Sequence, residues 1–319
     1  MIYTAVNDFY LSQSELNASA SRADGVSAPL EAQLRRYGCD AIAEAVVLLH
    51  LPQSVACTAQ VLLHRFYCKR SLTRFDIKIT AMASAWLAAK LEEVIEIDSF
   101  QPLRLRDIIM VFYRVFRRKD NKYVDFIYPG TSRYDVIKTE VVRTERHMLR
   151  AFGFIVNVEH PHRFVLTFGQ LLGLERDVLQ VGWTLANDTL RSTTLCVRYR
   201  AEIVACGILY VAAKRSSTPM PEHPPWWRVF IGGSGSEEVL AAVVREIIEV
   251  EKLPRAEYVV LVKDYTSRGV GVPGAASPPP PFAPAPVPMP AQTTTIVKPQ
   301  VCYYACICMC IYMSWMMTM

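Results

Sequence analysis

The sequence has little net charge and no recognisable catalytic motif. Its 35 Lys and Arg residues against 30 Asp and Glu residues leave a formal net charge of +5 over 319 residues. This small excess, interleaved with acids, does not favour nucleic-acid binding by charge alone. A GxxxxGKS/T phosphate loop, an HExxH zinc motif and a GxSxG nucleophile motif are all absent. These absences disfavour an enzyme, and we expect no catalytic residue and no cofactor.

The sequence also lacks the signs of a secreted or metal-binding protein. The stretch MIYTAVNDFYLSQSE at the start has no basic region followed by an apolar core, which indicates an intracellular, reducing compartment. His160 and His162 flank Pro161 without a third ligand in view, so we interpret them as turn histidines at a helix start and predict no metal site. Five cysteines stand singly in apolar patterns and are expected to be buried. These are Cys39, Cys57, Cys68, Cys196 and Cys206.

Convincing runs of alternating polar and apolar residues, which would indicate strands, are missing as well. Apolar residues instead recur at three- and four-residue steps, as in Val55, Ala59, Leu62, Leu63 and Phe66. The same period predicts helices over 77–91, 107–118, 134–151, 161–172, 177–195, 199–214 and 236–251. The sequence therefore predicts an all-α protein.

Two helices share an unusual ending. WLAAKLEE (86–93) and GILYVAAK (207–214) both place a lysine after two alanines, at Lys90 and Lys214. The interval from Lys90 to Lys214 is far longer than the repeat of a solenoid, so it indicates two similar domains. Each of these helices is predicted to be the third of about five in its domain. Their small residues would let neighbouring helices approach closely, as a central helix requires.

Composition divides the chain into four predicted segments. They are an irregular N-terminal arm (1–33), a first helical domain (34–157), a second helical domain (158–265) and a Pro-rich linker with an uncharged Cys- and Met-rich tail (266–319). The linker stretch 269–290 is polyproline-like and has little to bury.

The last 19 residues, 301–319, carry no charge and allow three interpretations. Their length is near the minimum for a bilayer-spanning helix, so a membrane anchor is one. A metal site through Cys306, Cys308 and Cys310 is another, although zinc sites favour wider spacing. A mis-predicted terminal exon is the interpretation that we favour, because the segment has few leucines and many Met and Cys residues. We expect no membrane association unless this tail is genuine.

Several long motifs resemble the cyclin family, and within it the L-type cyclins. In the first domain these motifs are RRYGCD, LHLPQSV, QVLLHRFYCKRS and WLAAKLEE; in the second they are EHPHRF, the stretch 185–215 and PEHPPWWRVF. The resemblance covers roughly residues 30–265. It implies two tandem five-helix cyclin boxes, in agreement with the repeat.

The resemblance also implies a function. Cyclins are non-catalytic subunits that bind and activate cyclin-dependent serine/threonine kinases as heterodimers, and the L-type cyclins are associated with transcription or pre-mRNA splicing in the nucleus. An alternative is a cyclin-box scaffold similar to general transcription factors, which would bind DNA or polymerase. A strongly basic face and a zinc ribbon would favour this alternative, and neither is found. We expect no direct contact with nucleic acid.

In the cyclin family a lysine at the end of the third helix and a glutamate in the fifth contact backbone groups of the kinase. The resemblance maps these roles onto Lys90 and Glu145. From the residues alone, Lys90 is equally well explained as a cation that complements the helix dipole. Glu145 could be solvated, or paired with Arg143 or Arg146. The family's apolar kinase contacts map onto Leu87, Leu91, Leu149, Phe154 and Val156, of which Leu87 and Leu149 could instead belong to the core.

The chain departs from its relatives at three places. Cell-cycle cyclins carry an apolar docking patch on the first helix, and the aligned stretch here is LRRYG (34–38). Gly38 weakens that patch, so we expect no docking of short RxL-type motifs. The tail is Pro-rich rather than Arg/Ser-rich, which weakens the splicing role more than kinase binding. The stretch SGSEEVLAAVVREIIEVEKL (234–253) is only loosely similar to the family, so the resemblance supports the last helix least.

The basic stretch RVFRRKDNK (114–122) could contact RNA or the kinase, but we interpret it as a solvated helix end.

Overall fold

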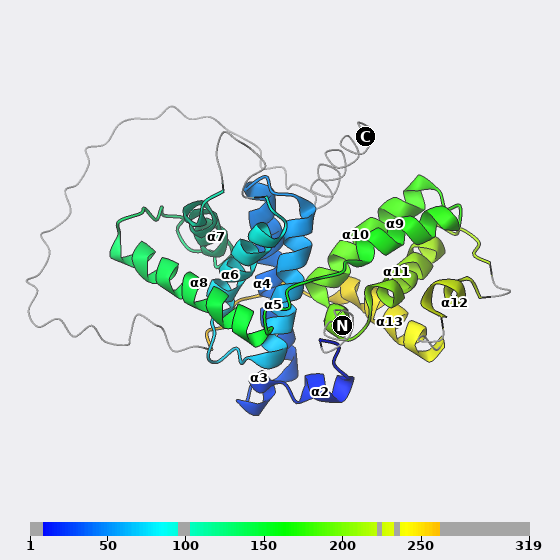
Figure 1. Ribbon diagram of the computed structural model, residues 1–319, viewed down its shortest axis with the longest axis horizontal. Helices are drawn as coiled ribbons and strands as arrows, with labels where there is room; N and C mark the ends of the chain where they lie inside the picture. The colour runs from blue at the N-terminus through cyan, green and yellow to red at the C-terminus, as the bar shows by residue number, and fades with distance from the viewer. Residues whose placement is uncertain (1–8, 95–102, 222–224, 233–236, 262–319) are drawn as a thin grey trace, which may run out of the picture. The chain divides into compact units, whose positions relative to one another are not determined.

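The computed structural model describes residues 9–94, 103–221, 225–232 and 237–261 (Figure 1). Every regular element in these residues is a helix, so the predicted all-α class is confirmed. The Pro-rich linker and the uncharged tail lie outside the described residues.

Two sets of five helices follow one another along the chain, as predicted. The first set is α4 (Ala28–Leu48), α5 (Gln53–Lys69), α6 (Ile77–Leu91), α7 (Leu105–Lys119) and α8 (Ser132–Ala151). The second set is α9 (Pro161–Leu171), α10 (Arg176–Ser192), α11 (Ala201–Arg215), α12 (Trp226–Ile231) and α13 (Glu237–Glu249). Two 3₁₀ turns, η1 (Leu195–Val197) and η3 (Val250–Lys252), complete the second set.

The predicted irregular arm is helical in part. Two short helices, α2 (Gln13–Asn17) and α3 (Ala20–Ala23), precede α4. Ser12 and Glu15 form a reciprocal capping box that starts α2. The main helix α4 already begins at Ala28, with Pro29 in its first turn, instead of near residue 34. Proline is accepted there because the first N–H groups of a helix have no partner within it.

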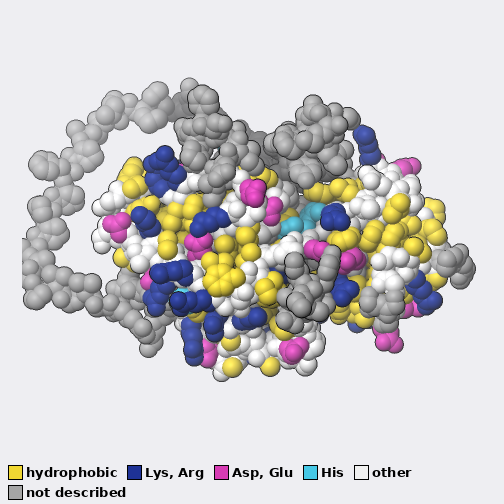
Figure 2. All heavy atoms as spheres, viewed as in Figure 1, with side chains coloured by type: hydrophobic (Ala, Val, Ile, Leu, Met, Phe, Trp, Pro, Cys, Tyr) yellow, Lys and Arg dark blue, Asp and Glu magenta, His cyan; other side chains and the backbone are white. Residues whose placement is uncertain are grey.

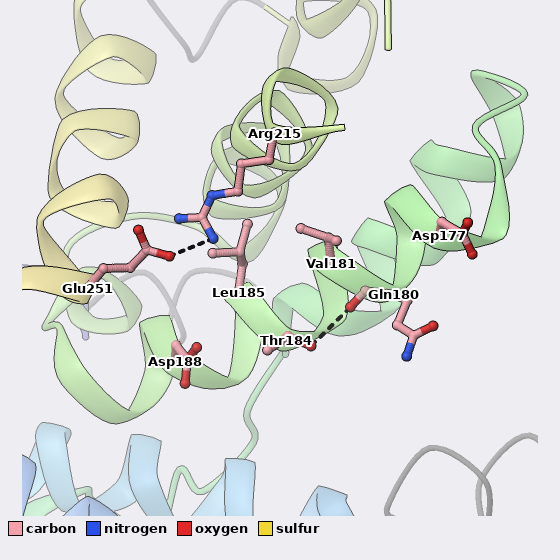
Figure 3. Close-up of a pocket in the computed structure, with 8 residues that line it drawn as sticks. All are labelled: Asp177, Gln180, Val181, Thr184, Leu185, Asp188, Arg215 and Glu251. Carbon is pink, nitrogen blue, oxygen red and sulfur yellow. Dashed lines mark hydrogen bonds and ion pairs between the residues drawn. The ribbon is translucent and has the colours of Figure 1, made fainter. Parts of the chain in front are cut away.

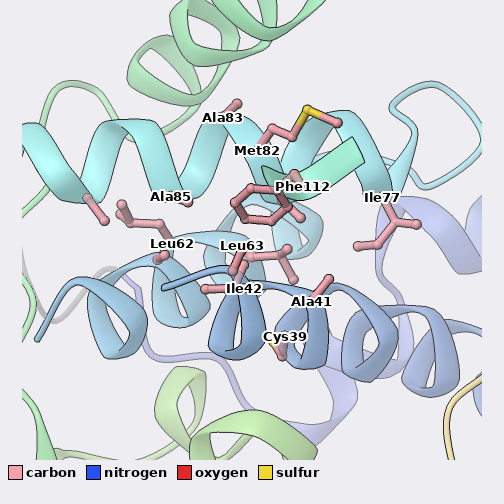
Figure 4. Packing of buried hydrophobic residues seen from close by; sticks show 14 of the residues in the cluster. Cys39, Ala41, Ile42, Leu62, Leu63, Ile77, Met82, Ala83, Ala85 and Phe112 are labelled. Atoms are coloured by element: carbon pink, nitrogen blue, oxygen red, sulfur yellow. The ribbon is translucent and has the colours of Figure 1, made fainter. Parts of the chain in front are cut away.

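The helix α6 lies at the centre of the first set and contacts α4, α5, α7 and α8. Figure 4 shows Ala83 and Ala85 of α6 among the buried side chains of this core, with Leu62 and Leu63 of α5 below them. The approach of α4 to α6 is close at Gly38, where an added Cβ would lie 2.8 Å from Ile77 Cδ1. Gly38 is thus explained by packing.

The helix α11 holds the corresponding place in the second set, where it contacts α9, α10, α12 and α13. An added Cβ at Gly207 would lie 2.6 Å from Val243 Cγ1 of α13, so this pair of helices also depends on a small residue. The two Ala-Ala-Lys helices are therefore the third and central helices of their sets, as the sequence predicted.

Both central helices also end in the same way. The N–H of Glu93 donates to the carbonyl of Lys90 at 3.2 Å, and the N–H of Ser217 donates to the carbonyl of Lys214 at 3.3 Å. Glu93 and Ser217 adopt positive φ angles of 55° and 52°. The N–H of Val94 also donates to the carbonyl of Ala89, and the N–H of Thr218 donates to the carbonyl of Ala213. These bonds complete a Schellman motif at each helix end. The repeated lysine thus marks a repeated helix end.

The two sets of helices meet along a junction that combines apolar and polar contacts. Cys57 and Val61 of α5 form a small apolar cluster with Leu190 of α10. His64 of α5 donates to the carbonyl of Leu190 at 3.1 Å, and Gln53 of α5 donates to Asn187 of α10.

The two histidines beside Pro161 lie at this junction. His162 is buried and donates to Asn187 within the second set at 2.7 Å. His160 is half-buried at the N-cap position of α9, yet its Nε2 lies 2.8 Å from Thr58 Oγ1 and its side chain does not cap the helix.

After η3 the chain returns to the first set. We call residues 253–261 the return segment. Ala256 is buried in the first core, and the carbonyl of Glu257 accepts a hydrogen bond from Gln33 at 3.0 Å. The Tyr258 ring lies 5.4 Å from the Tyr37 ring, and Lys78 Nζ lies 3.6 Å from the Tyr258 ring centre. The return segment thus packs on α4 and α6.

We predict that Tyr258→Ala destabilises the protein by about 1–2 kcal/mol, because it removes an aromatic contact and a cation–π contact. Chemical denaturation of the full chain measures the change. Tyr123→Ala is the matched control, since Tyr123 is 84% exposed. Equal effects of the two substitutions would show that the return segment contributes nothing to stability.

We predict that stability falls as the pH is lowered from about 6.5 to 4. Burial lowers the pKa of His64 and of His160 to about 3, and that of His162 to about 4. The unfolded chain, with histidine pKa values near 6.5, therefore binds more protons in this window. Each histidine contributes a loss of up to about 1.4 kcal/mol per pH unit. Denaturation midpoints at several pH values measure this slope.

The variant His64→Gln/His162→Gln keeps an N–H donor at both positions but does not titrate. It should be less stable at neutral pH and should lose less stability on acidification than the parent chain. If both proteins lose stability at the same rate, these histidines are not the cause.

Candidate functional site

The predicted polar pair, Lys90 and Glu145, lies where α6 and α8 pack together. Lys90 is in the last turn of α6, a helix that starts where Asp76 caps the N–H of Lys78. Glu145 lies in the second half of α8, whose N-terminus is capped by Thr131. Because the two helices are neighbours, residues 55 positions apart in the sequence are brought together.

Lys90 and Glu145 form a direct ion pair. Lys90 Nζ donates to Glu145 Oε1 at 2.5 Å and lies 4.7 Å from the Trp86 ring centre. The lysine side chain is 39% exposed, whereas the glutamate side chain is 10% exposed. Arg143, which was considered as a partner of Glu145, instead pairs with Glu140. Glu145 is therefore paired with Lys90, and the alternative pairing with Arg143 is wrong.

The second Ala-Ala-Lys helix has no equivalent pair. Lys214 is exposed, and within the described part of the chain no carboxylate lies within ion-pair distance of it. Its neighbour Arg215 pairs with Glu251 at 2.8 Å. Among the described residues, Lys90 thus has a carboxylate partner and Lys214 does not.

An ion pair of this kind keeps unused hydrogen-bonding capacity. An ammonium has three donors and a carboxylate has about four acceptor positions, so one mutual hydrogen bond leaves both groups able to bind more. Because Lys90 is half exposed, its remaining donors are accessible to carbonyl groups of another molecule. The geometry can therefore present a donor and an acceptor side by side to a partner's backbone.

The five apolar residues predicted beside this pair differ in exposure. Phe154 is 70% exposed and Leu91 is 36% exposed. Leu149 and Val156 are half-buried and pack against the first core. Leu87 is 4% exposed, so it offers almost no area to a partner and we assign it to the core.

The exposure of Phe154 follows from the way α8 ends. Gly153, just after the last helical residues, has a φ of +59°, and Phe154 follows with a φ of +62°. The N–H of Phe154 donates to the carbonyl of Leu149 at 3.0 Å, which completes a Schellman motif. A positive φ is uncommon outside glycine, and here it turns a large aromatic ring toward solvent.

Glu92 is half-buried although it follows the exposed end of α6. Thr58 Oγ1 donates to Glu92 Oε1 at 2.7 Å, next to His160. This hydrogen bond attaches the end of α6 to α5 at the junction between the two helical sets. It thereby helps to fix the position of Lys90 two residues earlier.

A separate pocket of about 460 Å³ lies on the second helical set (Figure 3). It is lined by Asp177, Gln180, Val181, Thr184, Leu185, Asp188, Arg215 and Glu251. Arg215 pairs with Glu251 inside the pocket, and Asp177 lies at the opposite end in Figure 3. Burial raises the pKa of Asp188, which also pairs with Arg191 at 2.9 Å. None of the predicted site residues lines this pocket.

Two further searches cover only the described residues. No helix among them combines the length and apolar character needed to cross a bilayer. In the same residues, no three His, Cys, Asp or Glu side chains are grouped so that they could hold a metal ion. The tail with Cys306, Cys308 and Cys310 lies outside the residues covered.

The chain matches two family models. Residues 8–157 match the model described as "Cyclin, N-terminal domain", and residues 160–250 match the model described as "Cyclin-T2-like, C-terminal domain". The first match contains α4 to α8 with the Lys90–Glu145 pair, and the second contains α9 to α13.

Curated relatives are similar over most of this chain. Cyclin-L1-1 of Arabidopsis thaliana is 46% identical over 264 residues, which cover 83% of this chain and 61% of the relative. Cyclin-L1 of Homo sapiens is 34% identical over 262 residues, which cover 82% of this chain and 48% of the relative. The chain therefore spans about half to three fifths of the length of these relatives.

The fold also resembles a solved structure. A chain from the "Crystal Structure of the yeast RNA Pol II CTD kinase CTDK-1 complex" matches with a TM-score of 0.59 at 15% identity. The match covers 79% of this chain and 85% of that chain. At this identity the likeness concerns the fold alone.

Proposed function

Because this chain belongs to the cyclin family and its curated relatives are L-type cyclins, we propose that it binds and activates a cyclin-dependent serine/threonine protein kinase. It acts as a regulatory subunit in a heterodimer and not as an enzyme. The observation that carries this proposal is the match to cyclin models across both helical sets. We assign the first box to residues 28–157, since α4 begins at Ala28, and the second box to residues 158–265.

In this proposal the kinase docks on the first box, beside α6 and α8. Lys90 donates to backbone carbonyls of the kinase, and Glu145 accepts from its backbone N–H groups. Their mutual hydrogen bond holds both side chains near the required positions before the partner arrives, which reduces the entropy lost on binding. The polar contacts set the register of the complex.

Apolar contacts next to this pair supply affinity. Phe154 and Leu91 are exposed in the free chain, and Leu149 and Val156 add half-buried area. Full burial of a phenylalanine side chain is worth about 1.5–3 kcal/mol. Phe154 is therefore the apolar residue from which we expect the largest contribution.

Activation requires a difference in affinity between two kinase states. A partner shifts a conformational equilibrium only by as much as it binds one state more tightly than the other. A rigid surface achieves this if the kinase presents matching carbonyl and N–H groups only in its active arrangement. The packing of α6 against four helices provides that rigidity.

We further propose that the protein acts in the nucleus, in transcription or in pre-mRNA splicing. The L-type relatives support this assignment. A scaffold that binds DNA or polymerase is disfavoured, because the chain is similar to L-type cyclins over most of its length and its net charge is only +5.

Purification of the full chain from its native cells, followed by mass spectrometry, tests the partner. We expect a cyclin-dependent kinase to be recovered in roughly equal amount, because a stable heterodimer keeps its partner through washing. Recovery of DNA-bound factors or polymerase subunits without any protein kinase would contradict the proposal.

Substitution of the polar pair tests the site. We predict that Lys90→Ala/Glu145→Ala lowers the affinity for the co-purified kinase about tenfold or more, since charge-assisted hydrogen bonds contribute roughly 1.5–3 kcal/mol. Titration calorimetry with the isolated kinase measures the affinity, and circular dichroism checks that helix content is unchanged.

Lys214→Ala is the matched control, because Lys214 ends the equivalent helix of the second box without a carboxylate partner. It should leave the affinity unchanged. If the double variant binds as tightly as the parent chain, Lys90 and Glu145 do not belong to the interface.

A further inference from the structure

A group of basic residues covers the outer face of α8. Arg143, Arg146, His147 and Arg150 follow one another at steps of three, one and three residues, which places them on one side of a helix. The three arginines are exposed, and His147 is half-buried. Figure 2 shows Lys and Arg side chains gathered at the lower left, where α8 runs in Figure 1. We call these residues, together with Arg70, the basic face.

Arg70 joins this face from another helix. It is the C-cap residue of α5, a helix that contacts α8. Phe75, in the turn that follows α5, lies edge-on against His147 with 5.3 Å between the ring centres. The four guanidinium groups thus surround one imidazole that is held in place by an aromatic ring.

The charge of the basic face is largely uncompensated. Arg143 pairs with Glu140 at 3.5 Å, and among the described residues no ion pair is formed by Arg70, Arg146 or Arg150. Burial lowers the pKa of His147, and the four neighbouring guanidinium groups lower it further. Like charges at such spacings destabilise a helix, so their accumulation on one face indicates a role other than stability. An anionic ligand would neutralise them.

We propose that the basic face binds a phosphorylated segment of a partner protein. Guanidinium groups form two parallel hydrogen bonds with a phosphate, and clusters of arginine are a common means of recognising phosphoserine and phosphothreonine. Neutral His147 adds one N–H donor between them. The face therefore offers several convergent donors to one or two phosphate groups.

The dimensions of the face favour a phosphopeptide over a nucleic acid. Arg143 and Arg150 are seven residues apart, which is about 10 Å along a helix. An extended peptide covers the same distance in about three residues, so two phosphoserines at positions i and i+3 match the two ends of the face. A nucleic-acid surface would need a longer basic stripe with open aromatic rings, whereas Phe75 here packs against His147.

The basic face does not include the Lys90–Glu145 pair, although Leu149 of the proposed kinase contact is a neighbour of Arg146 on α8. Glu145 is 8% exposed and faces Lys90, whereas Arg146 and Arg150 point away into solvent. Charge reversal of the arginines therefore leaves the Lys90–Glu145 pair in place. Loss of phosphopeptide binding and loss of kinase binding can be measured independently on the same protein.

The test is a fluorescence anisotropy titration of the full chain at 0.15 M salt. The probe is a labelled 12-residue peptide with phosphoserines at positions i and i+3; the reference is the same peptide with unmodified serines. We expect the phosphorylated peptide to bind at least about tenfold more tightly, since two charge-assisted contacts exceed 1.4 kcal/mol. Arg146→Glu/Arg150→Glu should lower this affinity about tenfold or more.

Arg114→Glu/Lys138→Glu is the matched control, because it makes the same change in net charge at two exposed basic residues of the first box. It should change the affinity by less than about threefold. The variant Arg146→Lys/Arg150→Lys should give an intermediate loss, because lysine keeps the positive charge but cannot form two parallel hydrogen bonds with one phosphate. Equal binding of both peptides, or equal losses in the two charge-reversed variants, would overturn the proposal. Tighter binding of a 12-nucleotide single-stranded RNA than of the phosphopeptide would also overturn it.

Discussion

The architecture of the first box depends on one packing constraint, which is that α6 must be narrow enough to be surrounded. Four helices contact it, and its buried face consists largely of Ala, Ser and Thr with few large side chains. Such a helix has no freedom to shift, because interiors are packed at the density of organic crystals. Its last turn nevertheless reaches the surface. Lys90 is therefore an exposed cation at the end of the central helix of the box, and this explains how the chain can present a defined charge pair.

Sequence periodicity was sufficient to predict the helices and their grouping, because both depend on local pattern. Lys90 and Glu145 were singled out only by the resemblance to cyclins, and periodicity alone did not pair them. Several helix ends were harder to predict. The residue with positive φ that follows α4 is His50, that after α6 is Glu93 and that after α7 is Asn121. None of them is a glycine, so the usual sequence signal for a helix end is missing. The return segment could not be predicted at all. The contact of Tyr258 with Tyr37 joins residues 221 positions apart, and nothing near either residue in the sequence indicates it.

The hydrogen bonds of the junction have a consequence for how the two boxes behave. Apolar contacts such as those of Leu190 are non-directional, whereas the hydrogen bonds from His64 to Leu190 and from Gln53 to Asn187 cross the junction and fix one register. Both bonds are made by neutral side chains, so the register is specified without a buried charge. The return segment adds a second connection from the end of the second box to α4. The first box is thus held from two sides, which limits the motion of the surface that carries Lys90.

The helix α8 brings these features together, because its two faces meet opposite electrical requirements. On its inner side Glu145 is almost fully buried, and a buried carboxylate is tolerated only with a cation beside it, which Lys90 supplies. On its outer side Arg146 and Arg150 carry charge that no described carboxylate neutralises. Stability alone accounts for the inner pair but not for the outer arginines. The unused donors and acceptors of the inner pair can bind backbone groups of a kinase. The repulsion between the outer arginines would be removed by a phosphate group. The same helix is therefore suited to two different ligands.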